Sequence, residues 1–314
     1  MNTTRQLPAA PAVGPPAQTG LSWSYDEAFV RNRGLISPEE QERLRHARVA
    51  IAGMGGIGGI DLVTFARLGI GRFSIADPET FAVANTNRQF GAMASTIGRS
   101  KAQVMAQFAR DINPEVDLRV FEAPIGPDNV AEFLRDADVF IDAVEVFEAD
   151  VRRQLFRQAA AQGIYGITGG PVGFSGIWIS FDPKGMSFDS YFDFSDDMSP
   201  TEKLVAFAAG VAPKATHRPY MDLKYLDVSA RTAPSCAAAC HLAAAAIGSE
   251  VVKILLKKGK VRPAPYYQQF DPFVGRYARG YLWMGNRHPF QRLKRWWLKR
   301  FLENWQRQRS SAAR

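Results

Sequence analysis

The chain has 314 residues, of which 46% are hydrophobic and 22% are charged, as in an ordinary globular protein. No run of 18 uncharged apolar residues predicts a membrane-spanning helix, and residues 1–22 lack the basic start and apolar core of a secretory signal, so we predict a disordered leader. The net charge of +8 is concentrated in a tail from Arg287 to Arg314, so it says nothing about the folded core.

A helix and a strand open the folded part of the sequence. Ser37-Pro38-Glu39-Glu40 has the pattern of a helix start, with a serine cap, proline at the first position and acidic residues in the first turn. The apolar run "ARVAIAG" then predicts a buried parallel strand that ends in Gly53. Helical periodicity follows from Gly56 to Leu68, and "RFSIAD" predicts a second strand that ends in Asp77.

Helices and strands continue to alternate through the middle of the chain. Helical patterns at about 98–111, 127–135 and 149–162 are separated by the strand-like runs "VDLRVF", "ADVFIDA" and "GIYGIT". This alternation is typical of a doubly wound α/β fold, in which helices cover both faces of a mostly parallel sheet. We therefore predict one α/β domain over residues 23–285.

The pattern changes after residue 170. "GFSGIWISFDP" predicts an added strand, and residues 183–235 predict an irregular crossover segment. A long helix rich in small residues is predicted over "CAAACHLAAAAIGSEVVKILLKKG", residues 236–259, with Gly259 as its stop. The runs "YYQQFD" and "RYARGYLW" predict closing antiparallel strands. Within the crossover, the acidic and aromatic run "SFDSYFDFSDDMSPTEKL" fits either recognition of a basic partner or a surface loop with buried aromatic side chains.

The loop Gly53-Met54-Gly55-Gly56-Ile57-Gly58 stands between the first strand and its helix. Glycines let backbone amides approach a phosphate group, and the N-terminus of the following helix favours negative charge. Asp77 ends the next strand, where a carboxylate can accept hydrogen bonds from both ribose hydroxyls. On these residues alone, an NAD(P)-dependent oxidoreductase and an ATP-binding protein both remain open.

The segment after Asp77 favours ATP. It carries a set of amide and basic side chains: Asn85, Asn87, Arg88, Gln89 and Lys101. A hydride-transfer site has no need of an arginine and a lysine at distal phosphates. Adenylation of a carboxylate needs both, because pyrophosphate leaves and its oxygens must meet positive charge. A further carboxylate must hold Mg²⁺, and Asp142 is expected at the same carboxyl edge of the sheet as Asp77.

Taken together, the glycine loop, "NTNRQ", Lys101 followed by "INP" and the strand ending in Asp142 resemble the ThiF/MoeB/HesA superfamily, which includes the ubiquitin-activating enzymes. The resemblance implies a Rossmann-like fold that binds ATP and Mg²⁺. It assigns the phosphate loop to Gly53, Gly55, Gly56 and Gly58, and ribose binding to Asp77. Asn85, Arg88 and Gln89 match the conserved box of the family. Lys101 matches its phosphate-binding lysine, and Asp142 matches its metal ligand. In these families an N-terminal arginine enters the ATP site of the other subunit, which implies a homodimer with Arg31 in that role and Arg33 as the reserve.

Four runs are similar to the dehydratases that cyclise threonylcarbamoyladenosine in tRNA: "NTNRQ", "PDNVAEFL", "FIDAVE" and "TGG". These enzymes also activate a carboxylate with ATP. The resemblance therefore leaves two kinds of substrate open. One is the C-terminus of a protein or peptide, such as a small ubiquitin-like or sulfur-carrier protein, and the other is a small-molecule acid, including one carried on tRNA.

The sequence also departs from the family. No pair of CxxC motifs is present, so no zinc site is predicted. Residues 171–235 contain no cysteine, which argues against acyl transfer to this segment. Cys236 and Cys240 are predicted as small residues on a buried helix face. Around Val144-Glu145-Val146 the usual "TDN" is replaced, and Arg152 lies further along than usual.

The tail from residue 286 to 314 predicts a basic amphipathic helix. One face carries Phe290, Leu293, Trp297, Phe301 and Trp305, whereas the basic residues Arg292, Lys294, Arg295, Lys299 and Arg300 mostly lie off that face. Three roles remain open for the segment Pro289 to Arg309: peripheral contact with the inner membrane surface, binding of tRNA phosphates, and docking on the protein itself or on a partner.

The preferred hypothesis is a cytoplasmic adenylyltransferase, with an NAD(P)-dependent oxidoreductase and a non-catalytic nucleotide-binding scaffold as the alternatives. In this hypothesis Arg88 and Lys101 stabilise the leaving pyrophosphate, Asp142 holds Mg²⁺, and Arg31 completes the site across the dimer. His241 is expected to be a satisfied core histidine. Nothing in the sequence places His217 near the site.

Overall fold

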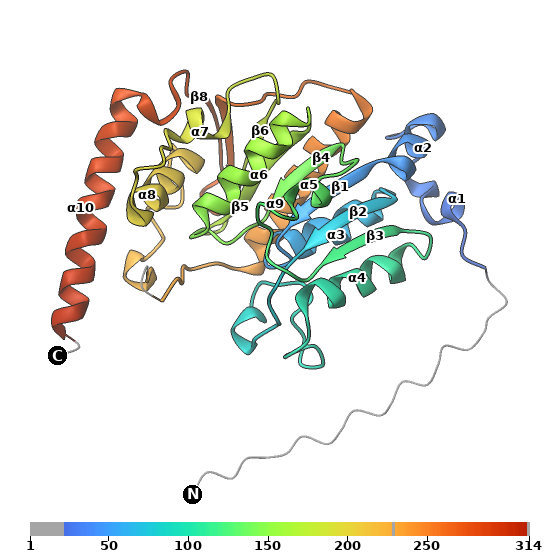
Figure 1. Ribbon diagram of the computed structural model, residues 1–314, viewed down its shortest axis with the longest axis horizontal. Coiled ribbons are helices and arrows are strands. Elements are labelled where there is room, and N and C mark those ends of the chain that lie inside the picture. The colour runs from blue at the N-terminus through green and yellow to red at the C-terminus, as the bar shows by residue number, and fades with distance from the viewer. Residues whose placement is uncertain (1–21, 228–229, 313–314) are drawn as a thin grey trace, which may run out of the picture.

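An eight-stranded mixed sheet organises the chain, with strand order β3-β2-β1-β4-β5-β6-β7-β8 (Figure 1). The computed structural model describes residues 22–227 and 230–312. For Leu223 and residues 305–312 it describes the backbone only. The predicted leader lies almost entirely outside the described residues. The strands are β1 (Arg48–Ala52), β2 (Arg72–Ala76), β3 (Asp117–Phe121), β4 (Val139–Asp142), β5 (Tyr165–Val172), β6 (Ser175–Phe181), β7 (Tyr266–Asp271) and β8 (Arg276–Tyr281).

Helices connect and cover these strands. The α-helices are α1 (Tyr25–Ala28), α2 (Pro38–His46), α3 (Gly58–Arg67), α4 (Lys101–Ile112), α5 (Val130–Phe133), α6 (Ala149–Ala161), α7 (Phe188–Phe192), α8 (Pro200–Val211), α9 (Ala237–Leu256) and α10 (Pro289–Ala312). Short 3₁₀ turns lie at η1 (Val30–Asn32), η2 (Val83–Asn85), η3 (Leu223–Tyr225), η4 (Pro272–Val274) and η5 (Gly285–Arg287).

The first five strands are parallel and the last three pairings are antiparallel, which confirms the predicted fold class. β1 lies at the centre, where Ile51 pairs with Ile75 on one side and Ile141 on the other. Because the carboxyl ends of parallel strands share one edge, the loops after β1, β2 and β4 meet there. This is the edge on which the sequence places the glycine loop, Asp77 and Asp142.

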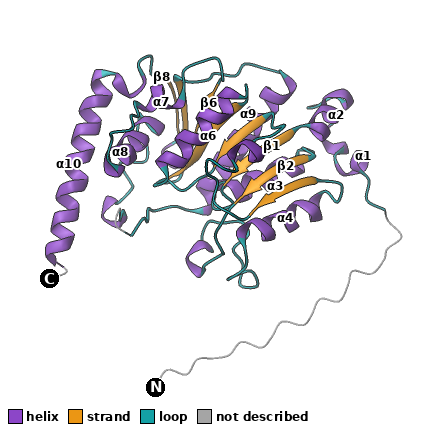
Figure 2. Cartoon of the chain, in the orientation of Figure 1, coloured by secondary structure: helices purple, strands orange, loops and turns teal. Residues whose placement is uncertain are grey.

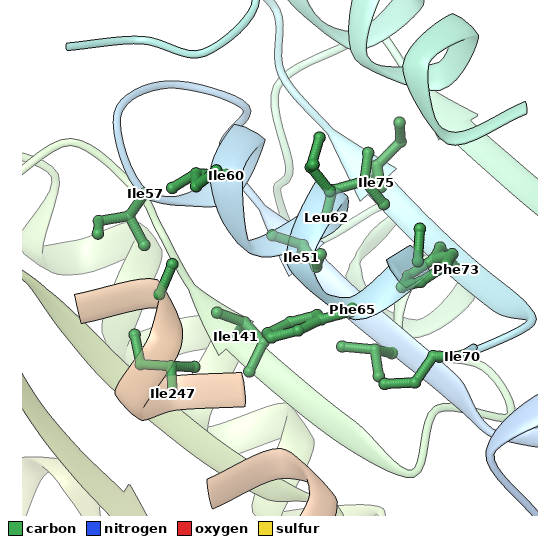
Figure 3. Packing of buried hydrophobic residues seen from close by; sticks show 14 of the residues in the cluster. Ile51, Ile57, Ile60, Leu62, Phe65, Ile70, Phe73, Ile75, Ile141 and Ile247 are labelled. Carbon is green, nitrogen blue, oxygen red and sulfur yellow. The ribbon is translucent and has the colours of Figure 1, made fainter. Parts of the chain in front are cut away.

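Two apolar layers enclose the sheet. On one face, α3, α4 and α9 pack together, and Phe65 of α3 lies with Ile51, Ile141 and Ile247 in a continuous buried cluster (Figure 3). On the other face, α5 to α8 cover a second cluster that is rich in phenylalanine, including Phe140 and Phe156. Burial on both faces explains why the central strands read as continuous apolar runs rather than alternating ones.

Most predicted elements are confirmed, with corrections at their ends. The predicted helix at 127–135 is a single turn, and the segment predicted as an irregular crossover contains α7 and α8 (Figure 2). α8 begins with a capping box in which Ser199 and Glu202 exchange hydrogen bonds, with Pro200 at the first position. α9 ends before Gly259, because Lys257 itself adopts the left-handed conformation that closes the helix.

The acidic and aromatic run of the crossover is used within the protein. Phe188, Tyr191 and Phe192 are buried in the second apolar cluster. Asp189 pairs with Arg153 at 3.0 Å, and Asp196 pairs with the same guanidinium at 2.8 Å. The alternative with buried aromatic side chains therefore holds, and four acids of the run, Asp189, Asp193, Asp196 and Glu202, have intramolecular partners.

α9 is long and apolar enough to cross a membrane by length and composition alone, a test that a buried core helix also passes. It is one such helix among the described residues, and half of its apolar window is buried inside the protein. It packs against α3, β5 and β6 and carries the buried Glu250. These contacts are those of a core helix.

α10 docks on α8 at the outer edge of the molecule (Figure 1). Gln291 and Leu302 are buried there, and Gln291 Nε2 donates to the Ala209 carbonyl at 2.9 Å. Lys299 pairs with Glu202 at 2.9 Å, and Arg295 pairs with Asp193 at 2.6 Å. Intramolecular docking is thus real, but it does not use the face of Phe290, Leu293 and Trp297, which are exposed. The side chain of Trp305 lies outside the described part of the chain.

Candidate functional site

The glycine loop joins β1 to α3 by a close backbone contact with the loop after β4. Gly53 has φ +98°, and a Cβ there would lie 2.3 Å from the Ala143 carbonyl oxygen. A Cβ at Gly58 would lie 1.7 Å from the Gly53 carbonyl oxygen. Only glycine fits at either position. The loop therefore presents backbone next to the N-terminus of α3, as a phosphate-binding loop does.

Asp77 fixes this loop from the end of β2. Its Oδ2 accepts from the Met54 amide at 2.7 Å, and its Oδ1 accepts from the Glu79 amide at 2.9 Å. Burial raises the pKa of the Asp77 carboxyl. Each carboxylate oxygen has two lone pairs, so the contacts with Met54 and Glu79 leave acceptor capacity for ribose hydroxyls.

The amides of the predicted box have three different surroundings. Asn85 Oδ1 accepts from the Ala82 amide at 2.9 Å and closes the η2 turn. Asn87 Nδ2 donates to the Ser235 carbonyl at 2.9 Å, which ties the box to the chain just before α9. Gln89 is buried with its amide 3.5 Å from where a Gly55 Cβ would lie, and its Oε1 has no hydrogen-bond partner among the described residues. Of the three amides, only Gln89 thus offers an unused buried polar atom within the described part of the chain.

Arg88 is the basic side chain that the structure brings to the glycine loop without an acidic partner. Its Cγ lies 3.8 Å from where a Gly56 Cβ would be. Its Nη1 donates to the Ala84 carbonyl at 3.0 Å and to Asn87 Oδ1 at 3.1 Å, both neutral acceptors. No ion pair of Arg88 occurs within the described residues. The positive charge beside the loop is therefore available to an anionic ligand.

Lys101 has an acidic partner. It is the first residue of α4 and is almost fully buried, with Nζ 2.6 Å from Glu79 Oε2. Glu79 follows Asp77 by two residues, so this ion pair lies on the same rim as the ribose-binding candidate. The ammonium has three N–H donors, so a phosphate can share Lys101 with Glu79 or replace it.

Asp142 is held by its own surroundings. The Nε of Arg152 lies 3.0 Å from Oδ1 and 2.8 Å from Oδ2, and Thr168 Oγ1 donates to Oδ2 at 2.6 Å. The Val144 amide donates to Oδ1 at 3.2 Å. A carboxylate has about four lone-pair sites, and three donors occupy them, one of which is shared between the two oxygens.

This donor set does not fit Mg²⁺ as it stands, because an Mg²⁺ ion would have to displace Arg152 from Asp142. The next carboxylate of the same loop, Glu145, is exposed and makes no ion pair within the described residues. No three His, Cys, Asp or Glu side chains gather into a metal site in the described part of the chain. Sequence reasoning missed the Arg152 contact because it depends on the path of the loop between β4 and α6.

The structure does not bring Arg31 or Arg33 to the glycine loop of their own chain. The segment before α2 is anchored at the far end of α3, where Asn32 Nδ2 donates to the Leu68 carbonyl at 3.2 Å. The glycine loop lies at the other end of this ten-residue helix, about 15 Å away along the axis. Arg31 is exposed there.

The cysteines and histidines lie beside the site rather than in it. Cys240 is buried under the loop, with Sγ 3.2 Å from where a Gly56 Cβ would be, and burial raises its pKa to about 11. Cys236 is half-buried at the start of α9, with Sγ 3.7 Å from the Gly173 carbonyl. His217 contacts Gln269 of β7, and burial lowers its pKa. The expectation of a core histidine is wrong for His241, which is exposed on α9.

A family model matches most of this chain. The model is described as the ThiF family, and it covers residues 29–288. The chain belongs to the ThiF family. The match includes the glycine loop, the box from Asn85 to Gln89, Lys101 and Asp142, so the residues that carried the resemblance lie within the family domain.

Curated relatives match the ThiF domain in part. The tRNA threonylcarbamoyladenosine dehydratase of Haemophilus influenzae is 36% identical over 123 residues, which are 39% of this chain and 47% of the relative. The sulfur carrier protein adenylyltransferase of Thermus thermophilus is 29% identical over 162 residues, or 50% of this chain and 57% of the relative. The chain thus spans about half the length of the curated relatives it matches.

Solved structures share the fold over a longer stretch. PaaA superposes with a TM-score of 0.62 at 19% identity and covers 85% of this chain and 76% of its own. The tRNA N6-threonylcarbamoyladenosine dehydratase of E. coli superposes with a TM-score of 0.55 at 21% identity, covering 74% of this chain and 95% of its own. At such identities the likeness shows the ThiF-type fold alone.

One buried acid of this ThiF domain was not predicted to matter. Asp61 lies in the first turn of α3 with no exposed surface, and neither of its carboxylate oxygens has a hydrogen-bond partner among the described residues. Burial raises its pKa well above the usual range. Asp61 lies in an apolar stretch of helix, so the residue type itself was the only feature of the sequence that could have indicated a buried acid here.

We expect the ionisation of Asp61 to make the protein less stable as pH rises. The unfolded carboxyl ionises near pH 4 and the folded one only at higher pH, so the free energy of unfolding falls between these pKa values. Asp61→Asn should remove this fall. Relative to wild type, the free energy of unfolding of the variant should be higher by about 1 kcal/mol or more at pH 8 than at pH 4. Urea unfolding at both pH values measures it. Asp111→Asn, at an exposed position of α4, is the control, and an unchanged slope in Asp61→Asn would contradict the prediction.

Proposed function

We propose that this ThiF-family chain adenylates a carboxylate with ATP and releases pyrophosphate. The observation that carries the proposal is Arg88, whose Cγ lies 3.8 Å from where a Gly56 Cβ would be and whose guanidinium donates to two neutral acceptors, the Ala84 carbonyl and Asn87 Oδ1. A cation without an acidic partner next to a backbone anion loop suits the charge that leaves with pyrophosphate. A dinucleotide oxidoreductase gives this cation no role.

The proposed reaction is a single displacement at the α-phosphorus. A carboxylate oxygen of the substrate forms a bond to this phosphorus as its bond to the pyrophosphate oxygen breaks, which leaves an acyl adenylate and pyrophosphate. The amides of the glycine loop hold the phosphates, and Asp77 orients the ribose. Arg88 stabilises the departing oxygens, and Lys101 joins it when a phosphate shares its ammonium with Glu79 or replaces Glu79.

Mg²⁺ is part of the proposal as the counterion that ATP phosphates normally bring. Asp142 serves as its ligand only after the ion pair with Arg152 opens. We therefore assign no step of the reaction to the metal.

The substrate acid is proposed in two classes. Relatives named as sulfur carrier protein and SAMP-activating enzymes favour a protein C-terminus. Relatives named as tRNA threonylcarbamoyladenosine dehydratases favour an acid carried on tRNA. Pyrophosphate release on addition of tRNA, measured against release with a peptide that ends in Gly-Gly, distinguishes the two classes.

We further propose that the active protein is a cytoplasmic homodimer in which Arg31 enters the partner's ATP site. Arg31 is exposed and is held far from the glycine loop of its own chain. Large exposed side chains on the outer strands, including Phe270, Tyr277 and Tyr281, provide apolar surface for a second copy. Light scattering on the purified protein tests the dimer, and a strictly monomeric active protein would contradict it.

Calorimetric titration with MgATP, NAD⁺ and NADP⁺ tests the nucleotide directly. We expect micromolar affinity for MgATP, at least about 100-fold tighter than for either dinucleotide, which corresponds to about 2.7 kcal/mol. Binding of NAD⁺ without ATP would restore the oxidoreductase reading. Binding of ATP with no pyrophosphate release across both classes of acid would favour the nucleotide-binding scaffold.

A further inference from the structure

The side of α10 that faces away from α8 carries large apolar side chains. Phe290, Leu293, Trp296 and Trp297 are 71%, 60%, 54% and 41% exposed. At 100° per residue these positions gather on the half of the helix opposite the docked Gln291 and Leu302. We call these four residues the outward face of α10. Single exposed apolar residues are ordinary, but four on one helix face form a patch that marks an interaction surface.

The charge around the outward face is mainly positive. Arg287, Arg292 and Arg300 are exposed and make no ion pair within the described part of the chain. The acidic residue of this stretch, Glu303, borders the same face by helical spacing, and its carboxylate lies 4.0 Å from Lys299 Nζ. The cations of α10 therefore divide into two groups, one that holds the helix on the body and one that borders the outward face.

Two arginines also contact the tryptophans of this face. The guanidinium of Arg300 lies 5.0 Å from the Trp296 ring centroid, and that of Arg218, from the crossover segment, lies 4.5 Å from Trp297. These contacts place delocalised cations at the level of the indole rings. Tryptophan with arginine at one level is the arrangement of side chains at the boundary between lipid headgroups and acyl chains.

We propose that the outward face of α10 lies flat on an anionic lipid bilayer. The four apolar side chains enter the headgroup boundary, and Arg287, Arg292 and Arg300 contact lipid phosphates. The helix is already folded and anchored by Gln291, Arg295 and Lys299, so docking needs no new secondary structure. Figure 1 shows α10 along the outer edge of the molecule. The proposal is independent of the adenylation chemistry.

A nucleic acid and a second protein copy suit this face less well. Phosphate binding by RNA needs the cations but leaves Leu293 and Phe290 in water. A second copy placed by two-fold symmetry would bring the arginines of two identical faces together, and Glu303 is the one acid on each face to offset them.

Flotation of the full-length protein with lipid vesicles tests the proposal. We expect it to float with phosphatidylcholine vesicles that contain about 30% phosphatidylglycerol, and about tenfold less with pure phosphatidylcholine. Leu293→Ala combined with Trp296→Ala should weaken binding by about tenfold or more. The matched control is Leu35→Ala with Tyr225→Ala, which removes 78% and 66% exposed apolar side chains elsewhere. Unfolding temperatures are measured for every variant.

The charge is tested separately. Arg292→Gln with Arg300→Gln should weaken binding to anionic vesicles by about fivefold for each cation, whereas Arg110→Gln with Arg135→Gln, exposed arginines of the sheet domain, should not. Three outcomes overturn the proposal: no flotation with anionic vesicles, flotation that the outward-face variants leave unchanged, or retention of tRNA in place of vesicles. Loss of dimerisation in the Leu293 and Trp296 double variant, without loss of flotation, assigns the face to a second copy and also overturns it.

Discussion

Replacement of Arg88 by alanine is expected to lower carboxylate-dependent pyrophosphate release by about 10³-fold. The guanidinium is the cation at the glycine loop without an acidic partner in the described residues, so its removal leaves the departing pyrophosphate charge unopposed. The free energy of unfolding should change by less than about 0.5 kcal/mol, because the side chain is only half-buried and its acceptors are neutral. Turnover and urea unfolding measure the two effects.

Arg110→Ala provides the matched control, since this arginine is exposed on α4 and lies outside the site. Near-normal turnover in Arg88→Ala would remove the basis of the proposed function.

A mixture of Arg88→Ala with Arg31→Ala extends the experiment. If Arg31 acts across a homodimer, equal parts of the two inactive variants should regain about a quarter of wild-type activity, because one site in each mixed dimer is intact.

Arg152→Met is expected to cost about 3–5 kcal/mol in the free energy of unfolding. Asp142 is 1% exposed and depends on the Nε of Arg152 for its charge partner. Removing the guanidinium leaves a buried carboxylate without compensation. The same side chain also donates to the Glu145 carbonyl at 2.9 Å and lies over the Phe207 ring, so the loop after β4 should loosen too.

Arg157→Met is the control for this result. Arg157 pairs with Asp189 but is 57% exposed, so its loss should cost less than about 1 kcal/mol. The double variant Asp142→Asn, Arg152→Met should recover part of the stability because no buried charge remains. A loss below about 1 kcal/mol in Arg152→Met would mean that Asp142 does not depend on Arg152 for its charge partner. The Asp142 carboxylate could then bind a cation in place of Arg152.

The parallel half of the sheet was predictable because its strands are buried on both faces and therefore appear as short apolar runs between helical patterns. The glycine loop, Asp77 and Asp142 were predictable for a related reason, since the ends of parallel strands share an edge. α8 carried the same start signal that was recognised before α2, serine followed by proline with an acid in the first turn, but it lay in a segment taken as irregular.

Other features depend on contacts between distant residues. Two site residues have ion-pair partners that were not predicted: Glu79 for Lys101 and Arg152 for Asp142. These pairs depend on the paths of two loops, which hydrophobic periodicity in the sequence does not predict. The tail shows a similar limit. Helical spacing correctly grouped Phe290, Leu293 and Trp297 on one face. The side that packs on the protein carries the buried Gln291 and Leu302, and two residues are too few to produce a recognisable periodic pattern.

The position of α9 has a consequence for how the protein is made. This helix covers α3 and packs with β5 and β6, although about 170 residues separate its start from the end of α3. At ribosomal rates of about 5–20 residues per second, the apolar side of nascent α3, including Phe65, waits roughly ten to thirty seconds for its cover. During that interval the growing chain is a client for chaperones, and its first half acquires a stable core only when one of the last helices arrives.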